Sequence, residues 1–372
     1  MPKNVLITGG AGFIGSHLAD ELLARGHHVR VLDSLVPQVH GDGGGRPEYL
    51  DEAVELRVGD VTDPQAVRAA LQDIDTVYHF AAAVGVGQSM YEIAHYTRTN
   101  NLGTAVLLEA LIEKPVEQLI VASSMSLYGE GLYRDADGQV RDMGERPLAQ
   151  LRAGQWEWQD AQGRALVPAP TPESKAPALA SVYALSKYDQ ERLCLMTGRA
   201  YGFKTVALRF FNAYGPRQAL SNPYTGVLAI FAARLLNGNA PQIFEDGLQQ
   251  RDFVSVYDIA RGCRLAMESD AAAGEVFNLG SGVPYTVREV AERVARAVGR
   301  EDIAPEITGK YRTGDIRHCY ADIDKAQRVL GYAPQVDLSG GLTELAAWLE
   351  GQAAIDRVSQ ASAELARRGL AL

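Results

Sequence analysis

The sequence predicts an α/β protein built around a doubly wound parallel sheet, and two observations support this prediction. Apolar segments typical of strands lie at residues 5–7, 27–32, 54–58 and 76–80, and helical patterns such as residues 64–71 separate them. A glycine-rich turn joins the first strand to the first helix. Strands that alternate with helices in this way imply right-handed crossovers between parallel strands.

Composition excludes several classes of protein. The 372 residues carry a formal charge of −10, which opposes non-specific binding to nucleic acid. Apolar residues are dispersed, and no run approaches the roughly eighteen needed to cross a membrane. The chain enters its first strand at once, without an apolar leader, which favours the cytoplasm. Because Cys194, Cys263 and Cys319 are far apart, we expect neither a disulfide framework nor a metal site.

The turn after the first strand has the spacing of a dinucleotide-binding loop. Gly9 permits a tight turn, Gly12 lets the backbone approach a pyrophosphate, and Gly15 lets the next helix pack closely on the sheet. Phe13 and Ile14, between these glycines, are candidate cofactor contacts, and the helix predicted from Ser16 directs unpaired N–H groups and the positive end of its dipole at the phosphates. An ordinary loop explains such glycines when no strand and helix flank them, but here both are predicted.

The second strand ends in Asp33. A carboxylate in this place accepts hydrogen bonds from the adenosine ribose hydroxyls and repels a 2′-phosphate. We therefore expect NAD rather than NADP as the cofactor.

A catalytic pair is predicted near the start of a later helix. The four-residue step from Tyr183 to Lys187 puts both side chains on one helix face. A phenol has an ordinary pKa of about 10, so a neighbouring ammonium and a cationic nicotinamide are needed to stabilise its phenolate as a general base. Taken alone, the pair also fits an exposed helix surface.

The segment 118–129 is predicted to be a buried strand that ends in hydroxyl groups. They lie at the carboxyl edge of the predicted sheet, where open α/β sheets bind ligands. Ser124, and Ser126 two residues later, are therefore candidates to hydrogen-bond the reacting oxygen of a substrate.

In this order, the glycines, Asp33, Asp60, Ser124 and the pair of Tyr183 and Lys187 resemble the extended short-chain dehydrogenase/reductases, the family of NAD-dependent epimerases and dehydratases. The resemblance runs from residue 1 to about residue 348. It implies an NAD-binding Rossmann domain and a smaller C-terminal domain that binds a nucleotide-diphosphate sugar. It also implies cofactor contacts from Asp60, Val61, Ala81, Ala82, Tyr183 and Lys187, with Asn100 supporting the active-site backbone.

On the substrate side, the resemblance assigns four residues. Asn212 is expected beside the sugar diphosphate, and Arg251 and Arg312 are expected to clamp it with planar guanidinium groups. An arginine bound only to water is the ordinary alternative for both. Phe244 is expected to line the nucleotide base, although a place in the core explains this residue equally well.

The resemblance also suggests boundaries and an assembly. We expect an NAD-binding domain at 1–208 and 252–281, a nucleotide-sugar-binding domain at 209–251 and 282–350, and a helical tail at 351–372. Two predicted helices, at 104–113 and 183–201, resemble those that pair across a two-fold axis in relatives. A homodimer is therefore expected.

An insertion at residues 131–177 separates the Ser124 strand from the Tyr183 helix. Its turns at 135–138 and 160–163 predict two short hairpins, which resemble zinc knuckles without their ligands. Because the insertion has no cysteine or histidine, we expect no metal there. Trp156 and Trp158 fit either an anchor on the body or a cover over the sugar.

Three segments narrow the resemblance to the dTDP-L-rhamnose 4-epimerases: the insertion with residues 171–173, the run 84–91, and the stretch 221–227. Val84, Gln88 and Ser89 would then face the sugar. A UDP-glucose/UDP-galactose 4-epimerase is the alternative.

Two further alternatives are a sugar 4,6-dehydratase and a non-catalytic NAD-binding scaffold. Dehydratases of this family carry an Asp-Glu pair after the strand-end hydroxyl, where this chain has Met125 and Ser126. A scaffold has no need of a base, whereas Tyr183 and Lys187 are both present. The sequence therefore favours an epimerase.

Overall fold

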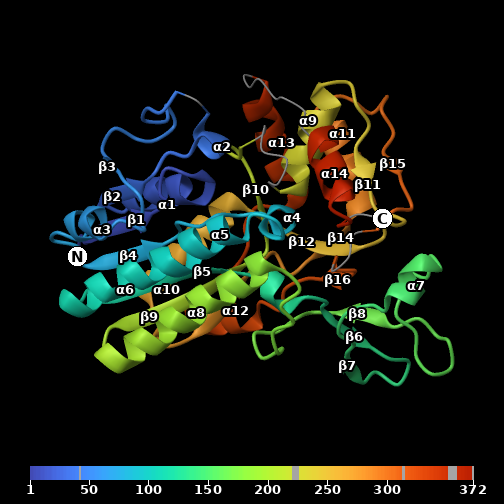
Figure 1. The fold of residues 1–372 in the computed structure, drawn as a ribbon, viewed down its shortest axis with the longest axis horizontal. Helices are drawn as coiled ribbons and strands as arrows, with labels where there is room; N and C mark the ends of the chain where they lie inside the picture. The colour runs from blue at the N-terminus through green and yellow to red at the C-terminus, as the bar shows by residue number, and fades with distance from the viewer. Residues whose placement is uncertain (42, 220–225, 312–314, 351–357, 371–372) are drawn as a thin grey trace.

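The computed structural model describes residues 1–41, 43–219, 226–311, 315–350 and 358–370. A seven-stranded sheet forms its centre, in the order β3-β2-β1-β4-β5-β9-β13 (Figure 1). Every neighbouring pair in it is parallel, which confirms the predicted doubly wound sheet. The strands are β1 (Asn4–Thr8), β2 (His28–Asp33), β3 (Glu55–Val58), β4 (Thr76–His79), β5 (Gln118–Ser124), β9 (Lys204–Phe210) and β13 (Val276–Leu279).

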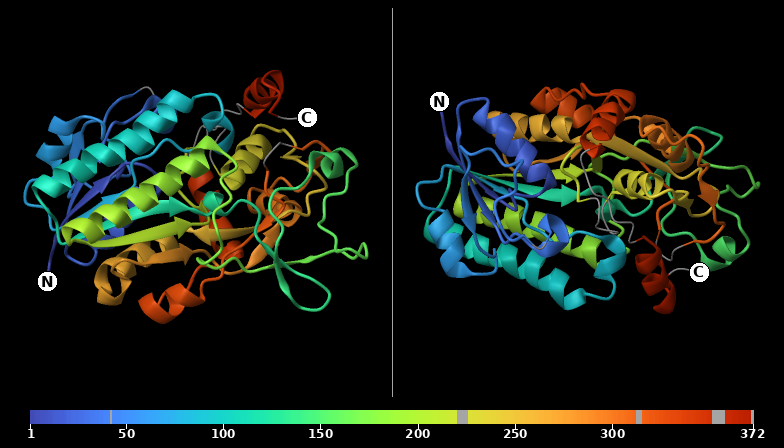
Figure 2. Two further views of the ribbon diagram at one scale, coloured as in Figure 1. Left: turned by 60° about the horizontal axis from the view of Figure 1, so that its bottom comes forward. Right: turned by 90° about the horizontal axis from the view of Figure 1, so that it is seen from above.

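Helices cover both faces of this sheet (Figure 2). On one face lie α1 (Phe13–Leu23), α10 (Val256–Glu268) and α12 (Asp324–Leu330), whose apolar side chains share a hydrophobic cluster. On the other face, α3 (Pro64–Ala70), α6 (Gly103–Glu113) and α8 (Val182–Tyr201) share a second cluster. Crossover helices on both faces explain why strands such as β5 are buried along their whole length.

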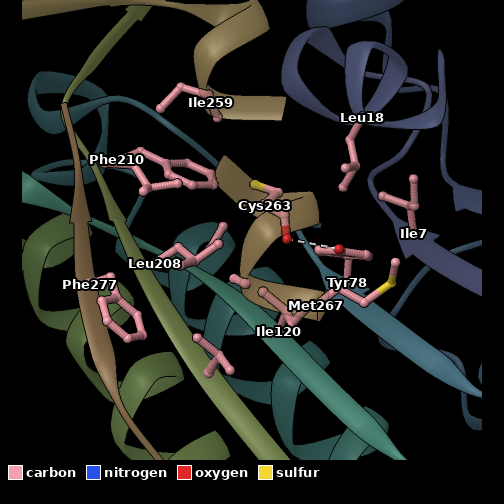
Figure 3. Close-up of a cluster of buried hydrophobic side chains, with 14 of the residues drawn as sticks. Ile7, Leu18, Tyr78, Ile120, Leu208, Phe210, Ile259, Cys263, Met267 and Phe277 are labelled. Carbon is pink, nitrogen blue, oxygen red and sulfur yellow. Dashed lines mark hydrogen bonds between the residues drawn. The ribbon is translucent and has the colours of Figure 1, made fainter. Parts of the chain in front are cut away.

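The first of these clusters joins the sheet to α1 and α10 (Figure 3). Ile7 and Tyr78 come from neighbouring strands, Leu18 comes from α1, and Cys263 comes from α10. The fully buried Tyr78 hydroxyl donates to the Cys263 carbonyl at 3.0 Å. This bond satisfies a polar group that burial would otherwise leave without a partner.

A second unit lies at the carboxyl end of the central sheet. Its small sheet consists of β10 (Asn212–Tyr214), β12 (Gln250–Ser255), β14 (Pro284–Thr286) and β16 (His318–Cys319), and β11 (Gln242–Ile243) pairs separately with β15 (Glu306–Ile307). A third hydrophobic cluster packs under α9 (Val227–Leu236), α11 (Val287–Ala297) and α13 (Leu338–Leu349). Residues 252–255 lie in this small sheet, although their predicted place was in the NAD-binding domain.

The insertion forms a separate lobe beside β16, seen at the lower right of Figure 1. Strands β6 (Leu132–Arg134) and β7 (Val140–Asp142) make the first predicted hairpin, and β8 (Val167–Ala169) pairs with β6. The second predicted hairpin is shorter: Gln159 and Ala165 form an antiparallel bridge across its turn, and the Leu166 N–H donates to the Trp158 carbonyl at 2.8 Å. A short helix, α7 (Leu148–Arg152), lies between the two turns.

Short helical segments complete the described chain: α2 (Pro37–His40), α4 (Val86–Ser89), α5 (Ile93–Tyr96), a π-helix (Thr97–Leu102) and 3₁₀-helices at Met125–Tyr128 and Asp270–Ala272. The tail forms α14 (Val358–Arg367) and packs on α4, where a Cβ added to Gly87 would lie 3.3 Å from Leu365 Cδ2. The Arg368 guanidinium lies 4.2 Å from the centre of the Tyr91 ring. Within the described ranges, no helix combines the length and apolarity that a membrane crossing requires.

Candidate active site

The glycine loop between β1 and α1 leaves room for a phosphate group. A Cβ on Gly9, whose φ is +70°, would lie 2.8 Å from Ala81 Cα, and a Cβ on Gly15 would lie 2.6 Å from Gly10 Cα. A Cβ on Gly12, in contrast, would meet only the Gly9 carbonyl oxygen, at 3.3 Å. No side chain in the described part of the chain caps α1 at Gly12. The loop therefore fits a dinucleotide pyrophosphate at the N-terminus of α1.

Asp33 joins the end of β2 to this loop. Its buried carboxylate accepts hydrogen bonds from the backbone N–H of Ala11 at 3.0 Å and of Leu35 at 2.9 Å. His40 Nε2 lies 3.6 Å from the same carboxylate. The predicted ribose ligand thus stands beside the predicted phosphate loop.

The other predicted cofactor residues lie along the same edge of the sheet. Asp60 is exposed, and its carboxylate accepts bonds from the N–H and hydroxyl of Thr62, whereas Val61 is buried. Ala81 and Ala82 are half-buried directly after β4. The Asn100 side chain is fully buried and bonds both backbone groups of Ala83, at 2.7 and 3.1 Å. It also donates to Ser186 Oγ at 2.8 Å, so it joins this edge to α8.

Tyr183 lies in the first turn of α8. Its backbone N–H donates to Ser89 Oγ at 3.0 Å, and its ring packs edge-on against Tyr96 at 6.4 Å between centres. Burial raises the pKa of the Tyr183 phenol above 10.0, while a hydrogen bond with Ser124 lowers it. The protein alone therefore keeps this phenol protonated, and a phenolate requires positive charge from a bound group.

Lys187 lies one turn further along α8 and is also buried. Burial lowers its pKa to about 8. Its ammonium donates to Gln190 Oε1 at 2.8 Å, and Gln190 Nε2 donates to Thr104 Oγ1 at 2.9 Å. Sequence reasoning missed Gln190, although its three-residue step from Lys187 was a usable signal.

Two serines extend the hydroxyl contact of Tyr183. Ser124 ends β5, and Ser126 donates to Ser124 Oγ both from its hydroxyl at 2.9 Å and from its N–H at 3.1 Å. Met125 between them packs into the first hydrophobic cluster. The three hydroxyls of Tyr183, Ser124 and Ser126 thus form one chain of hydrogen bonds.

The predicted sugar-facing loop forms α4, and its residues differ in exposure. Val84 is exposed, whereas Gln88 and Ser89 are buried. The Ser89 hydroxyl donates to the Val86 carbonyl at 2.7 Å while it accepts from Tyr183, so it supports the base directly. Gln88 bonds Glu92 and the Tyr96 hydroxyl. Their contacts to a sugar stay predictions.

The predicted substrate residues of the second unit lie in three different environments. Asn212 Oδ1 is buried and has no hydrogen-bond partner among the described residues. Phe244 is half-buried and belongs to none of the hydrophobic clusters of the described chain. Arg251 donates to the carbonyls of Gln250, Ile316 and Arg317, so its guanidinium holds the segment before β16. Arg312 lies outside the described residues.

Sequence reasoning also missed a buried cluster of charged residues between the insertion and the second unit. Its centre consists of Arg146, Glu245 and Arg317, each of which has a side chain at most 3 % exposed. No local spacing signals this cluster, because its members are about 70 to 170 residues apart in the sequence.

Comparisons with known proteins agree with this arrangement. The sequence model of the "NAD dependent epimerase/dehydratase family" matches residues 5–152 and 163–280. The dTDP-L-rhamnose 4-epimerase of Burkholderia thailandensis is 36 % identical over 93 % of this chain and 95 % of its own length.

Two solved structures are also similar. The UDP-glucose 4-epimerase of Thermotoga maritima, determined with UDP-glucose, has a TM-score of 0.76 at 32 % identity and covers 93 % of this chain and 98 % of its own. The UDP-glucose 4-epimerase of Thermus thermophilus, in complex with NAD, has a TM-score of 0.73 at 32 % identity over 94 % of this chain and 100 % of its own.

Proposed function

Since this chain belongs to the NAD dependent epimerase/dehydratase family, we propose that it inverts C4 of a nucleotide sugar and that this sugar is dTDP-L-rhamnose. NAD is the cofactor of the family, and when bound it supplies an acceptor and donor of hydride. Asp33, the glycine loop and Lys187 are the residues that would hold it.

The observation that carries the proposal is the hydrogen-bonded chain of Tyr183, Ser124 and Ser126 at the carboxyl end of β5. In the proposed reaction, the Tyr183 oxygen takes the proton of the sugar hydroxyl and later returns it. Ser124 donates a hydrogen bond to the same sugar oxygen. A single base suffices, because the same proton leaves and comes back.

The residues after Ser124 favour epimerisation over dehydration. Loss of water requires a base that removes a proton from the carbon next to the oxidised carbon and an acid that protonates the hydroxyl leaving from the carbon beyond it. Met125 and Ser126 stand in the places of the Asp-Glu pair, and neither has a side-chain carboxyl group. Met125 packs into the core, and Ser126 donates a hydrogen bond to Ser124. An intact Tyr183 and Lys187 likewise favour an enzyme over a scaffold.

The choice of dTDP-L-rhamnose rests on the insertion, the α4 loop and the similarity to the Burkholderia enzyme. UDP-glucose and UDP-galactose are the second candidate substrates, because the Thermotoga enzyme has a similar fold and was solved with UDP-glucose. The two candidates differ in both the nucleotide and the sugar.

Purified protein and dTDP-L-rhamnose test the proposal. We expect the C4 epimer, dTDP-6-deoxy-L-talose, to form without added NADH and without net NADH formation. Substrate deuterated at C4 should give product that keeps its deuterium, because the hydride returns to the carbon it left. An inert dTDP-L-rhamnose together with rapid interconversion of UDP-glucose and UDP-galactose would reject the substrate, and no turnover on either would reject the enzyme.

A further inference from the structure

A buried set of ion pairs connects the insertion to the segment that carries Phe244. The Arg146 guanidinium donates to both carboxylate oxygens of Glu245, at 2.6 and 3.1 Å. The fully buried Arg317 donates to Glu245 at 2.9 Å and to Asp246 at 2.7 and 3.0 Å. Two parallel bonds between a guanidinium and a carboxylate fix both distance and orientation. Arg146 therefore determines where the Glu245 side chain lies.

Two acidic residues, one in the insertion and one directly before it, bond Arg317 and His318. Glu157 accepts hydrogen bonds from Arg317 Nε at 2.9 Å and from His318 Nε2 at 3.0 Å. Burial raises the pKa of Glu157, but the bonds from His318 and Arg317 outweigh it and lower the pKa to about 2. Glu130, at the base of the insertion, accepts from the backbone N–H groups of Arg317 and His318. Glu157 therefore remains ionised throughout the neutral pH range, and it keeps the insertion bonded to Arg317 and His318.

Glu245 has a backbone conformation that favours glycine. Its φ is +55°, in the left-handed region, where a side chain is strained. Its N–H donates to the Lys310 carbonyl at 2.7 Å, and its carbonyl accepts from Gly309 at 3.2 Å. A residue keeps such a conformation only where its surroundings hold it. Because Phe244 is the preceding residue, the bonds that hold Glu245 also orient Phe244.

The insertion also contacts Tyr311 and Asp315. Arg146 donates to the Asp315 carbonyl at 3.3 Å. The Trp156 ring packs against Tyr311, with 6.3 Å between ring centres, and the Trp156 carbonyl accepts from Arg146. Tyr311 and Asp315 are the described neighbours of 312–314. The Arg146 side chain therefore bonds both Glu245, next to Phe244, and the Asp315 backbone.

We propose that Arg146 is a positioning residue for the nucleotide, and that the insertion acts through the Arg146–Glu245 pair to hold Phe244 in its binding arrangement. This inference rests on the proposed function, a reaction on a nucleotide sugar, and on the place beside the nucleotide base that the family resemblance implies for Phe244. The hydrogen-bond partners of Arg146 among the described residues do not include Tyr183, and in this scheme Arg146 acts on binding rather than on the chemical step. Removal of the Arg146 guanidinium leaves Glu245 paired with Arg317, so the buried carboxylate keeps a charged partner.

The test compares Arg146→Met and Arg146→Lys with the wild type. Titration calorimetry with dTDP and with UDP measures nucleotide binding, and steady-state kinetics with the active sugar separates KM from kcat. For Arg146→Met we expect the Kd of the preferred nucleotide and the KM to rise about tenfold, with kcat within about twofold and NAD binding unchanged. Arg146→Lys keeps the charge but only part of the fork, so its Kd should lie between the two.

Arg141→Met is the matched control. Arg141 also belongs to the insertion and pairs with an aspartate, Asp135, but this pair is exposed and outside the buried cluster. Its loss should leave Kd, KM and kcat at wild-type values. A Kd change of the same size as in Arg146→Met would show that any change in the insertion acts alike, and would overturn the proposal.

If Arg146→Met does not fold, Glu245→Gly provides a second test of the same pair. Glycine accepts the φ of +55° without strain, but it removes the carboxylate that Arg146 holds. It should reproduce the loss of nucleotide affinity, and an unchanged Kd would overturn the proposal. A fall in melting temperature or in kcat without a change in Kd would overturn it as well. A wild-type chain that binds neither nucleotide would reject the proposed function and this inference with it, whereas wild-type binding that Arg146→Met leaves unchanged rejects this inference alone.

Discussion

Tyr183 and Lys187 share one face of α8, but burial changes their proton affinities in opposite directions. It raises the pKa of the phenol and lowers the pKa of the ammonium to about 8. Both changes favour the uncharged form of a buried group. The Lys187 ammonium donates to Gln190, and the phenol shares a hydrogen bond with Ser124. The pair is therefore two separately held groups, and we expect their substitutions to have different effects.

Tyr183→Phe should fold and bind NAD normally, because it removes only the hydroxyl and keeps the ring that packs on Tyr96. We expect kcat to fall by at least about a hundredfold, since a general base typically contributes that much. Turnover of the nucleotide sugar and a fluorescence titration of NAD provide the two measurements. Near-wild-type turnover would reject Tyr183 as the base.

Lys187→Met should weaken NAD binding as well as turnover, because one ammonium is proposed to serve both the ribose and the base. The Gln190 amide then loses its bond to Lys187 but keeps the one to Thr104. An NAD titration identical to that of the wild type would contradict the dual role.

Asp33 should make NAD bind at least about tenfold more tightly than NADP. A buried carboxylate and a 2′-phosphate at contact distance repel each other by about 1 kcal/mol or more. Asp33→Asn removes the charge and keeps one acceptor oxygen, which can serve only one of the Ala11 and Leu35 amides, so it should narrow the preference for NAD over NADP. Equal affinities of the wild type for both cofactors would refute this role.

At the scale of the secondary-structure elements, two glycines at the β1–α1 junction have different roles, Gly12 in NAD binding and Gly15 in stability. Gly12→Ala places its Cβ against only one backbone oxygen, so we expect a folded protein whose melting temperature is close to wild type. Its NAD affinity should nevertheless fall, because the added methyl group occupies the space kept for the pyrophosphate.

Gly15→Ala is the companion substitution in the same helix. Its Cβ would lie 2.6 Å from Gly10 Cα and 2.7 Å from the Gly9 carbonyl oxygen, so α1 must move away from the loop. We expect a loss of about 1 to 3 kcal/mol in the free energy of unfolding, as overpacking typically costs. Thermal or urea unfolding should show that Gly15→Ala is less stable than Gly12→Ala. Equal stabilities of the two variants would contradict the packing role assigned to Gly15.

At the scale of the whole molecule, α6 and α8 lie side by side on one face (Figure 2) and expose apolar side chains. Ile112 is 36 % exposed, Leu185 46 % and Met196 51 %. An interface formed by these two helices would cover such exposed apolar side chains. We therefore propose that two copies pair through this face.

Met196→Asp should shift the protein from dimer to monomer in sedimentation velocity, since it places a charge in an apolar interface. Val140→Asp, at another exposed apolar residue in the insertion, is the control and should leave the dimer intact. A wild-type protein that sediments as a monomer at micromolar concentration would end this proposal.

Two buried histidines predict a loss of stability in acid. Burial lowers the pKa of His79 to about 3 and that of His17 to about 4, both from 6.5. In the unfolded chain these two histidines bind protons below about pH 6.5. In the folded chain they bind protons only near pH 3 and pH 4. The free energy of unfolding therefore falls as pH drops, by about 1.4 kcal/mol per pH unit for each such histidine.

His79→Gln tests the larger of these two effects. Thr8 and Thr104 lie on either side of the His79 ring, and an amide side chain keeps some of their hydrogen bonds. The variant should be less stable at pH 7 but should lose less stability than the wild type between pH 6.5 and 4.5. Urea unfolding at several pH values measures this slope, and equal slopes would rule out His79 as a cause.

The sequence by itself determined the central sheet, the phosphate loop and the pair on α8. Each of these is encoded by residues close together in the chain: a strand, three glycines and a helix, or two side chains four positions apart. Turn chemistry and helical periodicity convert such spacing directly into geometry. Ser124 was found in the same way, because the end of a parallel strand marks the ligand-binding edge.

Tertiary structure alone decided where the insertion binds and what several charged residues do. Arg146, Glu245 and Arg317 meet only after the second unit has folded against the insertion, and nothing in their local sequences distinguishes them from surface charges. Arg251 donates to nearby carbonyls, while its contact with phosphate stays a prediction, and the tail helix packs on α4. The physical reason is that burial and long-range partners set the role of a charged side chain, and neither is encoded in the spacing of neighbouring residues.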